Sequence, residues 1–406
     1  MEGWTNMNQL GCLFLMGPVD CNNPHIPAYS DDFLAELGKA LNKKISCVPM
    51  EELKTQELPI FFIASGGAEE SFKAVFKEVE GPYILLTTPA YNSLAAAMEI
   101  LGYLNEIGAK GEILHGSVEA IAKRIGVLER VAHAKKQLRS MRLGAIGDPT
   151  ASGLISSVAD PKKVYDACGM KIVDINMQEL VDEYHKGGYV ENTYTKQLKA
   201  MNYSADEVEK ALNVYGASKR LVEKYDLQAV TVRCFGLLSA IQTTGCLALA
   251  ILNSEGIPAA CECDTKSAVS MSIMYALTGE PSFMANPSCM DPEMSEIIFA
   301  HCTLPISMPD SYTLTTHFES GIGVAVSGDM APGPMTIFKC NDDLTRHYAG
   351  EAELIETMHR SDLCRTQMRL KLKDGTDYFA HSPISNHHMI CRGEWTDVIN
   401  EYFASL

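Results

Sequence analysis

The sequence lacks the features that would place it in a membrane or on a nucleic acid. No stretch of its 406 residues approaches the roughly 18 uninterrupted apolar residues that a membrane-spanning helix needs. Basic residues are few, because 34 Lys and Arg stand against 51 Asp and Glu, which gives a formal net charge of -17. Nucleic acids and anionic membranes bind basic surfaces, so neither is expected as a partner.

Signs of secretion are also missing. The N-terminus has an acid where a signal peptide carries Lys or Arg, and its apolar stretch is short, without a convincing small-residue cleavage site. The 13 cysteines are odd in number and irregular in spacing, and many lie inside apolar runs such as GCLFLMG and GCLALAIL. Buried free thiols in a reducing compartment explain this pattern better than disulfides do. We expect a cytoplasmic protein.

Neither glycine-rich nucleotide fingerprint occurs, and there is no internal repeat or low-complexity linker. Instead, short apolar runs such as LPIFFIASGG and GPYILLTTP alternate with amphipathic stretches, which favours parallel sheets covered by helices. A second such series begins at RLGAIG, and after Pro305 short Thr- and Val-bearing strands lie between Gly, Asp and Pro turns. We predict an α/β protein: two doubly wound, Rossmann-like α/β domains (residues 1–141 and 142–305), then an antiparallel β-barrel-like domain with a closing helix (306–406).

Two acids, Glu262 and Asp264, follow the apolar run GIPAA and precede a helical pattern, in CECDTKSAVSMSIMYALTG. The carboxyl ends of strands form the ligand crevice of open α/β sheets. If the segment is extended, residues two apart face the same side and both carboxylates converge on one ion. The alternative is helix capping by Asp264 or Thr265, which explains one acid better than two. A zinc-thiolate site through Cys261 and Cys263 is a further, weaker alternative.

Three histidines lie near the ends of strand-like stretches. His301 ends IIFAH, and His387 and His388 lie in ISNHHMI. A single histidine in such a place is more often structural than a ligand, but three beside a carboxylate pair favour a metal site. Oxygen ligands completed by imidazole suit Mn²⁺ or Mg²⁺ better than copper.

The segment ILNSEGIPAACECDTKSAVSMSIMYALTGEPSFMA resembles the metal-dependent L-fucose and L-arabinose isomerase superfamily. FAHCTLP is similar to its Ala-His segment, ISNHH to its C-terminal Asn-His segment, and GVAVSGDMAPGPMTIFKC to its barrel strands. The resemblance covers roughly residues 140–400. It implies an aldose–ketose isomerase that works through an ene-diol, with Mn²⁺ (or Mg²⁺ or another divalent ion) bound, and a homo-oligomer, a trimer or hexamer.

By this resemblance, Glu262 and Asp264 supply the catalytic acid–base function and also bind the metal. His387 and His301 are the further ligands, with His388 as the alternative to His387. Such a reaction needs a base that moves a proton between neighbouring carbons and an ion that stabilises the enediolate. The predicted sugar-binding residues are His388, Asn386, Arg233 and Gln242.

One feature departs from the family pattern. The segment Cys234–Cys246 contains no Asp or Glu where the family usually supplies a further Glu, and its long polar side chains are those of Gln242 and the preceding Arg233. Either Glu262 and Asp264 divide the work, or an acid such as Asp174 arrives from elsewhere, or the chemistry has changed. The alternative functions are a non-catalytic sugar-binding or regulatory protein on the same scaffold, and a zinc hydrolase or lyase that uses its cysteines.

Overall fold

The computed structural model describes residues 9–406 and divides the chain into two compact units, residues 9–133 and 134–404. Helix α5 (Val118–Ser140) carries the chain from the first unit into the second, and the predicted boundary between 141 and 142 follows directly after it. Residues 1–8, on which the expectation of no signal peptide partly rests, lie outside the described residues. Within residues 9–406, no helix combines the length and apolarity needed to cross a membrane.

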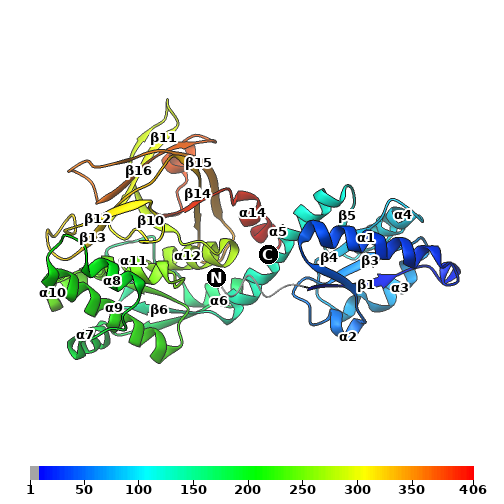
Figure 1. Ribbon diagram of the computed structural model, residues 1–406, viewed down its shortest axis with the longest axis horizontal. Coiled ribbons are helices and arrows are strands. Elements are labelled where there is room, and N and C mark those ends of the chain that lie inside the picture. Colours follow the sequence, from blue (N-terminus) through cyan, green and yellow to red (C-terminus); the bar gives the residue numbers. More distant parts are fainter. Residues whose placement is uncertain (1–8) are drawn as a thin grey trace. The chain divides into compact units, whose positions relative to one another are not determined.

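The first unit is built around a parallel five-stranded sheet in the order β2-β1-β3-β4-β5 (Figure 1). Helices α1 and α5 pack on one face, and α2, α3 and α4 pack on the other. Because both faces are covered, the central strands IFFI and YILLT are buried throughout, and the sequence reads as continuous apolar runs. The strands are β1 (Gln9–Leu15), β2 (Lys44–Cys47), β3 (Ile60–Ile63), β4 (Tyr83–Thr87) and β5 (Gly111–Leu114); the other helices are α1 (His25–Leu41), α2 (Met50–Leu53), α3 (Glu69–Val75) and α4 (Ser93–Glu106).

The second unit begins with a parallel four-stranded sheet in the order β7-β6-β8-β9. After β8 the chain forms two helices, α10 and α11, which are separated because the chain turns at Gln242, whose backbone is left-handed. The strands are β6 (Arg142–Ile146), β7 (Lys171–Ile175), β8 (Ala229–Val232) and β9 (Ala259–Ala260); the helices are α6 (Pro161–Cys168), α7 (Met177–Lys186), α8 (Thr193–Lys199), α9 (Ala205–Tyr225), α10 (Cys234–Ile241), α11 (Cys246–Ser254) and α12 (Thr265–Thr278).

The rest of the second unit is a closed antiparallel barrel in the order β10-β11-β16-β15-β14-β17. Closure leaves no free strand edge. A β12–β13 pair and two short helices accompany the barrel. The elements are β10 (Phe283–Asp291), β11 (Glu296–His301), β12 (Ser311–Thr315), β13 (Ala325–Asp329), β14 (Gly333–Cys340), β15 (His347–Met358), β16 (Thr366–Leu372), β17 (His388–Arg392), α13 (Asp377–His381) and α14 (Thr396–Ala404).

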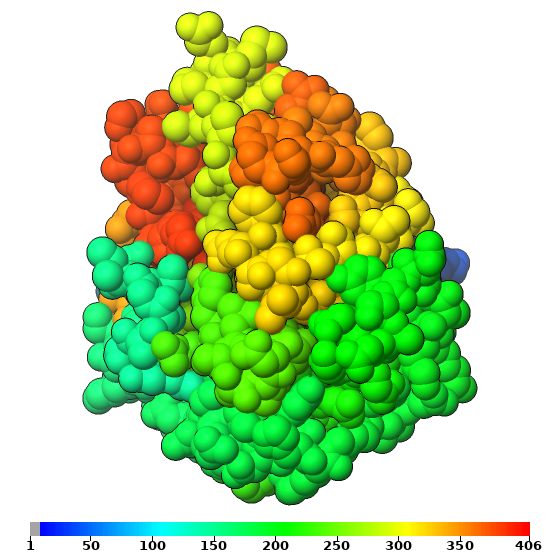
Figure 2. Space-filling model, turned by 90° about the vertical axis from the view of Figure 1, so that its left-hand side faces the viewer, coloured from blue at the N-terminus to red at the C-terminus, as the bar shows by residue number. Residues whose placement is uncertain are grey.

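Helix α12 joins the two parts of the second unit. It contacts β8 and β9 of the parallel sheet and β14 and β17 of the barrel, so nearly all of its side chains are buried. Figure 2 shows the yellow segments of the C-terminal part lying directly against the green segments of the α/β part. The predicted fold class, parallel α/β units followed by an antiparallel β-barrel, is confirmed.

Candidate active site

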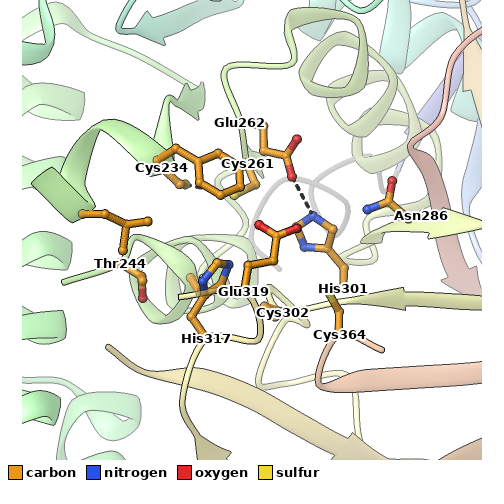
Figure 3. Close-up of a pocket in the computed structure, with 13 residues that line it drawn as sticks. Cys234, Thr244, Cys261, Glu262, Asn286, His301, Cys302, His317, Glu319 and Cys364 are labelled. Carbon is orange, nitrogen blue, oxygen red and sulfur yellow. Dashed lines mark hydrogen bonds and ion pairs between the residues drawn. The ribbon is translucent and has the colours of Figure 1, made fainter. Parts of the chain in front are cut away.

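A cavity lies where the carboxyl ends of β8 and β9 face the barrel and the loop between β12 and β13 (Figure 3). This is the edge at which open α/β sheets bind ligands. Three elements bring ionisable groups to it: the turn after β9, the end of β11, and the loop after β12. The lining residues are Cys234, Phe235, Leu238, Thr244, Cys246, Cys261, Glu262, Asn286, His301, Cys302, His317, Glu319 and Cys364.

The acidic motif is a tight turn, and the expectation of an extended segment is wrong. Strand β9 ends at Ala260, and both Glu262 (φ 61°) and Cys263 (φ 52°) have left-handed backbones. Each such residue costs about 1 kcal/mol or more, which is typical of functional sites. The turn sends the Glu262 side chain into the cavity and places Asp264 at the start of α12.

Glu262 lies between two imidazoles. Its Oε1 is 3.6 Å from Nε2 of His301 and 3.7 Å from Nε2 of His387 (Figure 3 shows the His301 pair). The His387 ring is fully buried, and its Nε2 forms no hydrogen bond with any of the described residues. A buried nitrogen without a hydrogen-bond partner destabilises the folded state unless a further group binds to it. The position fits a divalent ion held by one carboxylate and imidazole nitrogens.

Asp264 holds His387 from behind. Its Oδ2 is 2.9 Å from Nδ1 of His387 and also accepts the Ser267 hydroxyl at 2.7 Å, while Oδ1 accepts the Ser267 backbone N–H at 2.7 Å. The buried ammonium of Lys339 donates to the Ser267 hydroxyl at 2.8 Å and lies 4.0 Å from Oδ1. With Nδ1–H donated to Asp264, His387 presents the Nε2 lone pair, the arrangement of a carboxylate–histidine–metal triad.

Burial and charge shift the ionisation of these groups. Burial alone would raise the pKa of Glu262, but the two nearby imidazoles outweigh it and lower the pKa below its ordinary value. Burial lowers the pKa of His301, but Glu262 reverses this, so the pKa is raised. Burial likewise opposes ionisation of Asp264, yet Lys339 and the His387 hydrogen bond hold its pKa well below the ordinary range. Both carboxylates are therefore anionic at neutral pH.

The structure brings together Glu262, Asp264, His301 and His387, as the sequence predicted, but it changes the setting of Asp264. Both Asp264 oxygens are engaged by Ser267 and His387, and its side chain is completely buried behind the cavity. Its capping of α12, the alternative interpretation, is confirmed by the Ser267 N–H bond. We interpret Asp264 as a positioning residue. Both oxygens that its predicted roles as a metal ligand and a catalytic group would use already accept hydrogen bonds.

The predicted sugar-binding residues lie outside the cavity lining. Arg233 donates through Nε to the Ala151 carbonyl at 3.2 Å, and Gln242 is an exposed residue that donates to the Leu238 carbonyl at 2.8 Å. Asn386 and His388 instead line a second, wider and more open cavity. Asn386 donates a hydrogen bond through Nδ2 to Oδ1 of Asn286 (3.0 Å), a residue that lines the first cavity.

The loop after β12 supplies two residues that the sequence analysis missed, His317 and Glu319. Figure 3 shows the Glu319 carboxylate beside His301, whose pKa it helps to raise. Arg365 fixes this loop by donating to the Thr316 carbonyl at 2.8 Å and by lying over the Phe318 ring at 5.5 Å. Loop conformation has no periodic signature in sequence, so only the fold brings Glu319 to the site.

Other acids and thiols proposed from the sequence lie elsewhere. Asp174, suggested as a replacement acid, is exposed on the edge strand β7 and does not line the cavity. Cys261 and Cys263 point apart: Cys261 Sγ lies 2.9 Å from Cys234 Sγ, whereas Cys263 Sγ faces the Ile146 and Gly147 carbonyls, both at 3.7 Å. One metal ion cannot bind both thiols in this conformation.

Two curated proteins are similar to this chain. A sulfoquinovose isomerase from Clostridium sp. (strain MSTE9) is 27% identical over 266 residues, which is 62% of this chain and 56% of that protein. A sulfoquinovose isomerase from Alkalicoccus urumqiensis is 26% identical over 191 residues, 45% of this chain and 43% of that protein. The resemblance to the L-fucose and L-arabinose isomerase superfamily is confirmed. The chain spans about half the length of these relatives, and no protein-family model matches it.

Proposed function

We propose that this protein is an aldose–ketose isomerase that acts on a sugar and depends on a divalent metal ion, with Mn²⁺ as the expected ion. The observation that carries the proposal is the Glu262 carboxylate between His301 and His387, with the unpartnered Nε2 of His387 aimed at it. Glu262, His301 and His387 would hold the ion, and Asp264 would fix the His387 tautomer. The names of the two relatives support a sugar isomerase. The expected trimer or hexamer stays a prediction.

The bound ion would polarise the sugar carbonyl and stabilise the negative charge that develops as the ene-diol forms. The chain itself must supply a base that removes the proton from C2 and returns it to C1. Glu262 is unsuited to this step, because it is the carboxylate that both imidazoles face. Asp264 is unsuited because both of its oxygens are engaged.

Glu319 is the carboxylate that remains in the cavity, and we assign the proton transfer to it. The loop that carries Glu319 packs against Thr244, since a Cβ on Gly323 would lie 2.5 Å from Thr244 Oγ1. Thr244 belongs to the segment 234–246, where the acid usual in the family is missing. An acid carried by this loop can therefore reach the part of the site that the missing acid would occupy. Glu319 is exposed to solvent, so it can exchange its proton between turnovers.

The test is conversion of aldoses by metal-stripped protein to which Mn²⁺ is added back. Neutral pentoses and hexoses and a sulfonated hexose are incubated in D₂O, and proton NMR follows ketose formation and deuterium at the carbon that gains the proton. Turnover that depends on Mn²⁺, with solvent deuterium incorporated, is expected. Absence of turnover with every sugar and metal tried would contradict the proposal.

Three variants separate the roles. Glu262→Gln should abolish both Mn²⁺ binding and turnover, whereas Glu280→Gln, an exposed acid after the other end of α12, should change neither. Glu319→Gln should lower kcat by about 10²–10⁴-fold and leave Mn²⁺ binding intact. Equal loss of Mn²⁺ binding in the Glu262 and Glu319 variants would show that Glu319 is a ligand and not the proton carrier.

A further inference from the structure

The wall of the cavity next to Glu262 is unusually rich in thiols. Because β8 and β9 are parallel neighbours with Thr231 opposite Ala260, the residues just beyond their carboxyl ends lie side by side. Cys261 and Cys234 occupy these places, with their sulfur atoms 2.9 Å apart. In all, five of the 13 cysteines line this one cavity: Cys234, Cys246, Cys261, Cys302 and Cys364.

One of these thiols shares a group of donor atoms with the proposed ligands. Cys261 Sγ, a Glu262 carboxylate oxygen and a His301 ring nitrogen all lie within 4.8 Å of one another. Donors bound to one tetrahedral ion at about 2.0–2.3 Å lie about 3.3–3.8 Å apart, so a closure of up to about 1.5 Å brings the three together. A set of sulfur, oxygen and nitrogen is softer than the carboxylate and imidazole set of an Mn²⁺ site.

A second, independent observation points to a ligand at this place. Nε2 of His387 has no hydrogen-bond partner among the described residues, the ring is fully buried, and the nitrogen faces the same Glu262 oxygen at 3.7 Å. Cys261, Glu262 and His301 therefore offer one thiol, one carboxylate and one imidazole around one point, and His387 faces the same carboxylate oxygen with a second imidazole.

We propose that Cys261 is a metal ligand of this site and that the site therefore prefers a thiophilic divalent ion, Zn²⁺ or Co²⁺, to Mn²⁺ or Mg²⁺. This rests on the metal site of the proposed function and changes its expected ion. On binding, the thiol proton of Cys261 leaves to solvent and the thiolate joins the carboxylate of Glu262 as an anionic donor. Before the ion binds, the Cys261 thiol donates to Cys234 Sγ at 2.9 Å; once Cys261 is a thiolate, the S–H of Cys234 can donate to it.

Cobalt absorption spectroscopy on the full chain tests this directly. The protein is stripped of metal under reducing conditions and titrated with Co²⁺, because cobalt bound to a thiolate gives an intense near-ultraviolet charge-transfer band. Wild type should show this band at one equivalent. Cys261→Ser should abolish it and weaken Co²⁺ binding by about tenfold or more. Cys263→Ser is the matched control, because its thiol lies two residues away and faces the Ile146 carbonyl, so its band should equal that of wild type.

The outcomes separate this inference from the proposed function. A wild-type band that Cys261→Ser removes supports the thiol ligand even if no sugar is converted. Sugar conversion with Mn²⁺, by a protein whose Co²⁺ form lacks the band, would leave the isomerase proposal standing and overturn the thiol ligand. If Cys261→Ser does not fold, X-ray absorption of the wild-type Zn²⁺ form decides: one sulfur in the shell supports the proposal, and a shell of oxygen and nitrogen alone overturns it.

Discussion

Replacing Asp264 by Asn removes one charge from a completely buried network while keeping the size of the side chain. The cap of α12 survives, because an Asn oxygen accepts the Ser267 N–H as Asp does, so the loss of roughly 1 kcal/mol that accompanies removal of a cap is avoided. What is lost is the negative charge beside Lys339, whose side chain has no exposed surface. Leaving one member of a buried ion pair without its partner typically costs about 3–5 kcal/mol. We expect a destabilisation of that size.

The same substitution should also change the tautomer of His387. An Asn amide in place of Oδ2 donates to Nδ1, which moves the imidazole proton to Nε2, the nitrogen that faces Glu262. A protonated Nε2 cannot bind a metal ion, so we expect metal affinity to fall by about 10–100-fold. Titration with Mn²⁺ or Co²⁺ measures this effect separately from stability.

Urea unfolding of the metal-free chain measures the stability change, with Trp395 fluorescence as the probe in a Trp4→Phe background. The double variant Asp264→Asn with Lys339→Met removes both charges and should recover most of the loss, because an apolar pair can replace a buried ion pair at little cost. A single Asp264→Asn variant within about 1 kcal/mol of wild type would refute the charge argument. So would a double variant no more stable than the single one.

The pH dependence of this difference has a definite sign. The folded-state pKa of Asp264 lies below its ordinary value of 3.8, so its contribution is fully present above that value and is lost as pH falls through the folded pKa. The gap between wild type and Asp264→Asn should stay constant from pH 7 to about 5 and narrow only below about pH 4. A gap that narrows already near neutral pH would point to another group.

Two further changes follow from the structure. Gly323→Ala puts a methyl group 2.5 Å from Thr244 Oγ1 at a left-handed position (φ 68°). We expect it to lower the free energy of unfolding by about 1–3 kcal/mol and to lower kcat, because it displaces Glu319. Gly321→Ala is the control, because Gly321 has the same φ and no neighbour within 4 Å, and its stability and kcat should change less. Burial lowers the pKa of His388 from 6.5 to about 3. The free energy of unfolding of the metal-free wild type should therefore fall by up to about 1.4 kcal/mol per pH unit as pH falls below 6.5. Urea unfolding of His388→Gln should show a smaller decrease per pH unit.

Much of the architecture of this protein could be predicted from its sequence. Continuous apolar strands such as IFFI and YILLT require helices on both faces, and the short Thr- and Val-bearing strands between Gly, Asp and Pro turns after Pro305 indicate an antiparallel sheet. Such patterns are local, so they can be recognised without knowing the fold. The same holds for α12, whose start at Asp264 and end at Gly279 follow from capping chemistry.

The roles within the site could be predicted only in part. The sequence singled out Glu262, His301 and His387 by their places at strand ends, and these three residues do converge. It could not separate the roles of Glu262 and Asp264, because these depend on the left-handed backbones of Glu262 and Cys263. Lys339 left a weak signal, a single cation in an apolar strand, but its partner Asp264 lies far away in the chain.

What the sequence by itself determined is the set of elements and the residues at their ends, because periodicity, capping and turn chemistry act over a few residues. What only the tertiary structure decided is which of those ends meet. The adjacency of β8 and β9 places the sulfur of Cys234 beside that of Cys261, and the packing of the β12–β13 loop on Thr244 delivers Glu319 to the cavity. Both depend on contacts between residues distant in the chain, which no local pattern encodes.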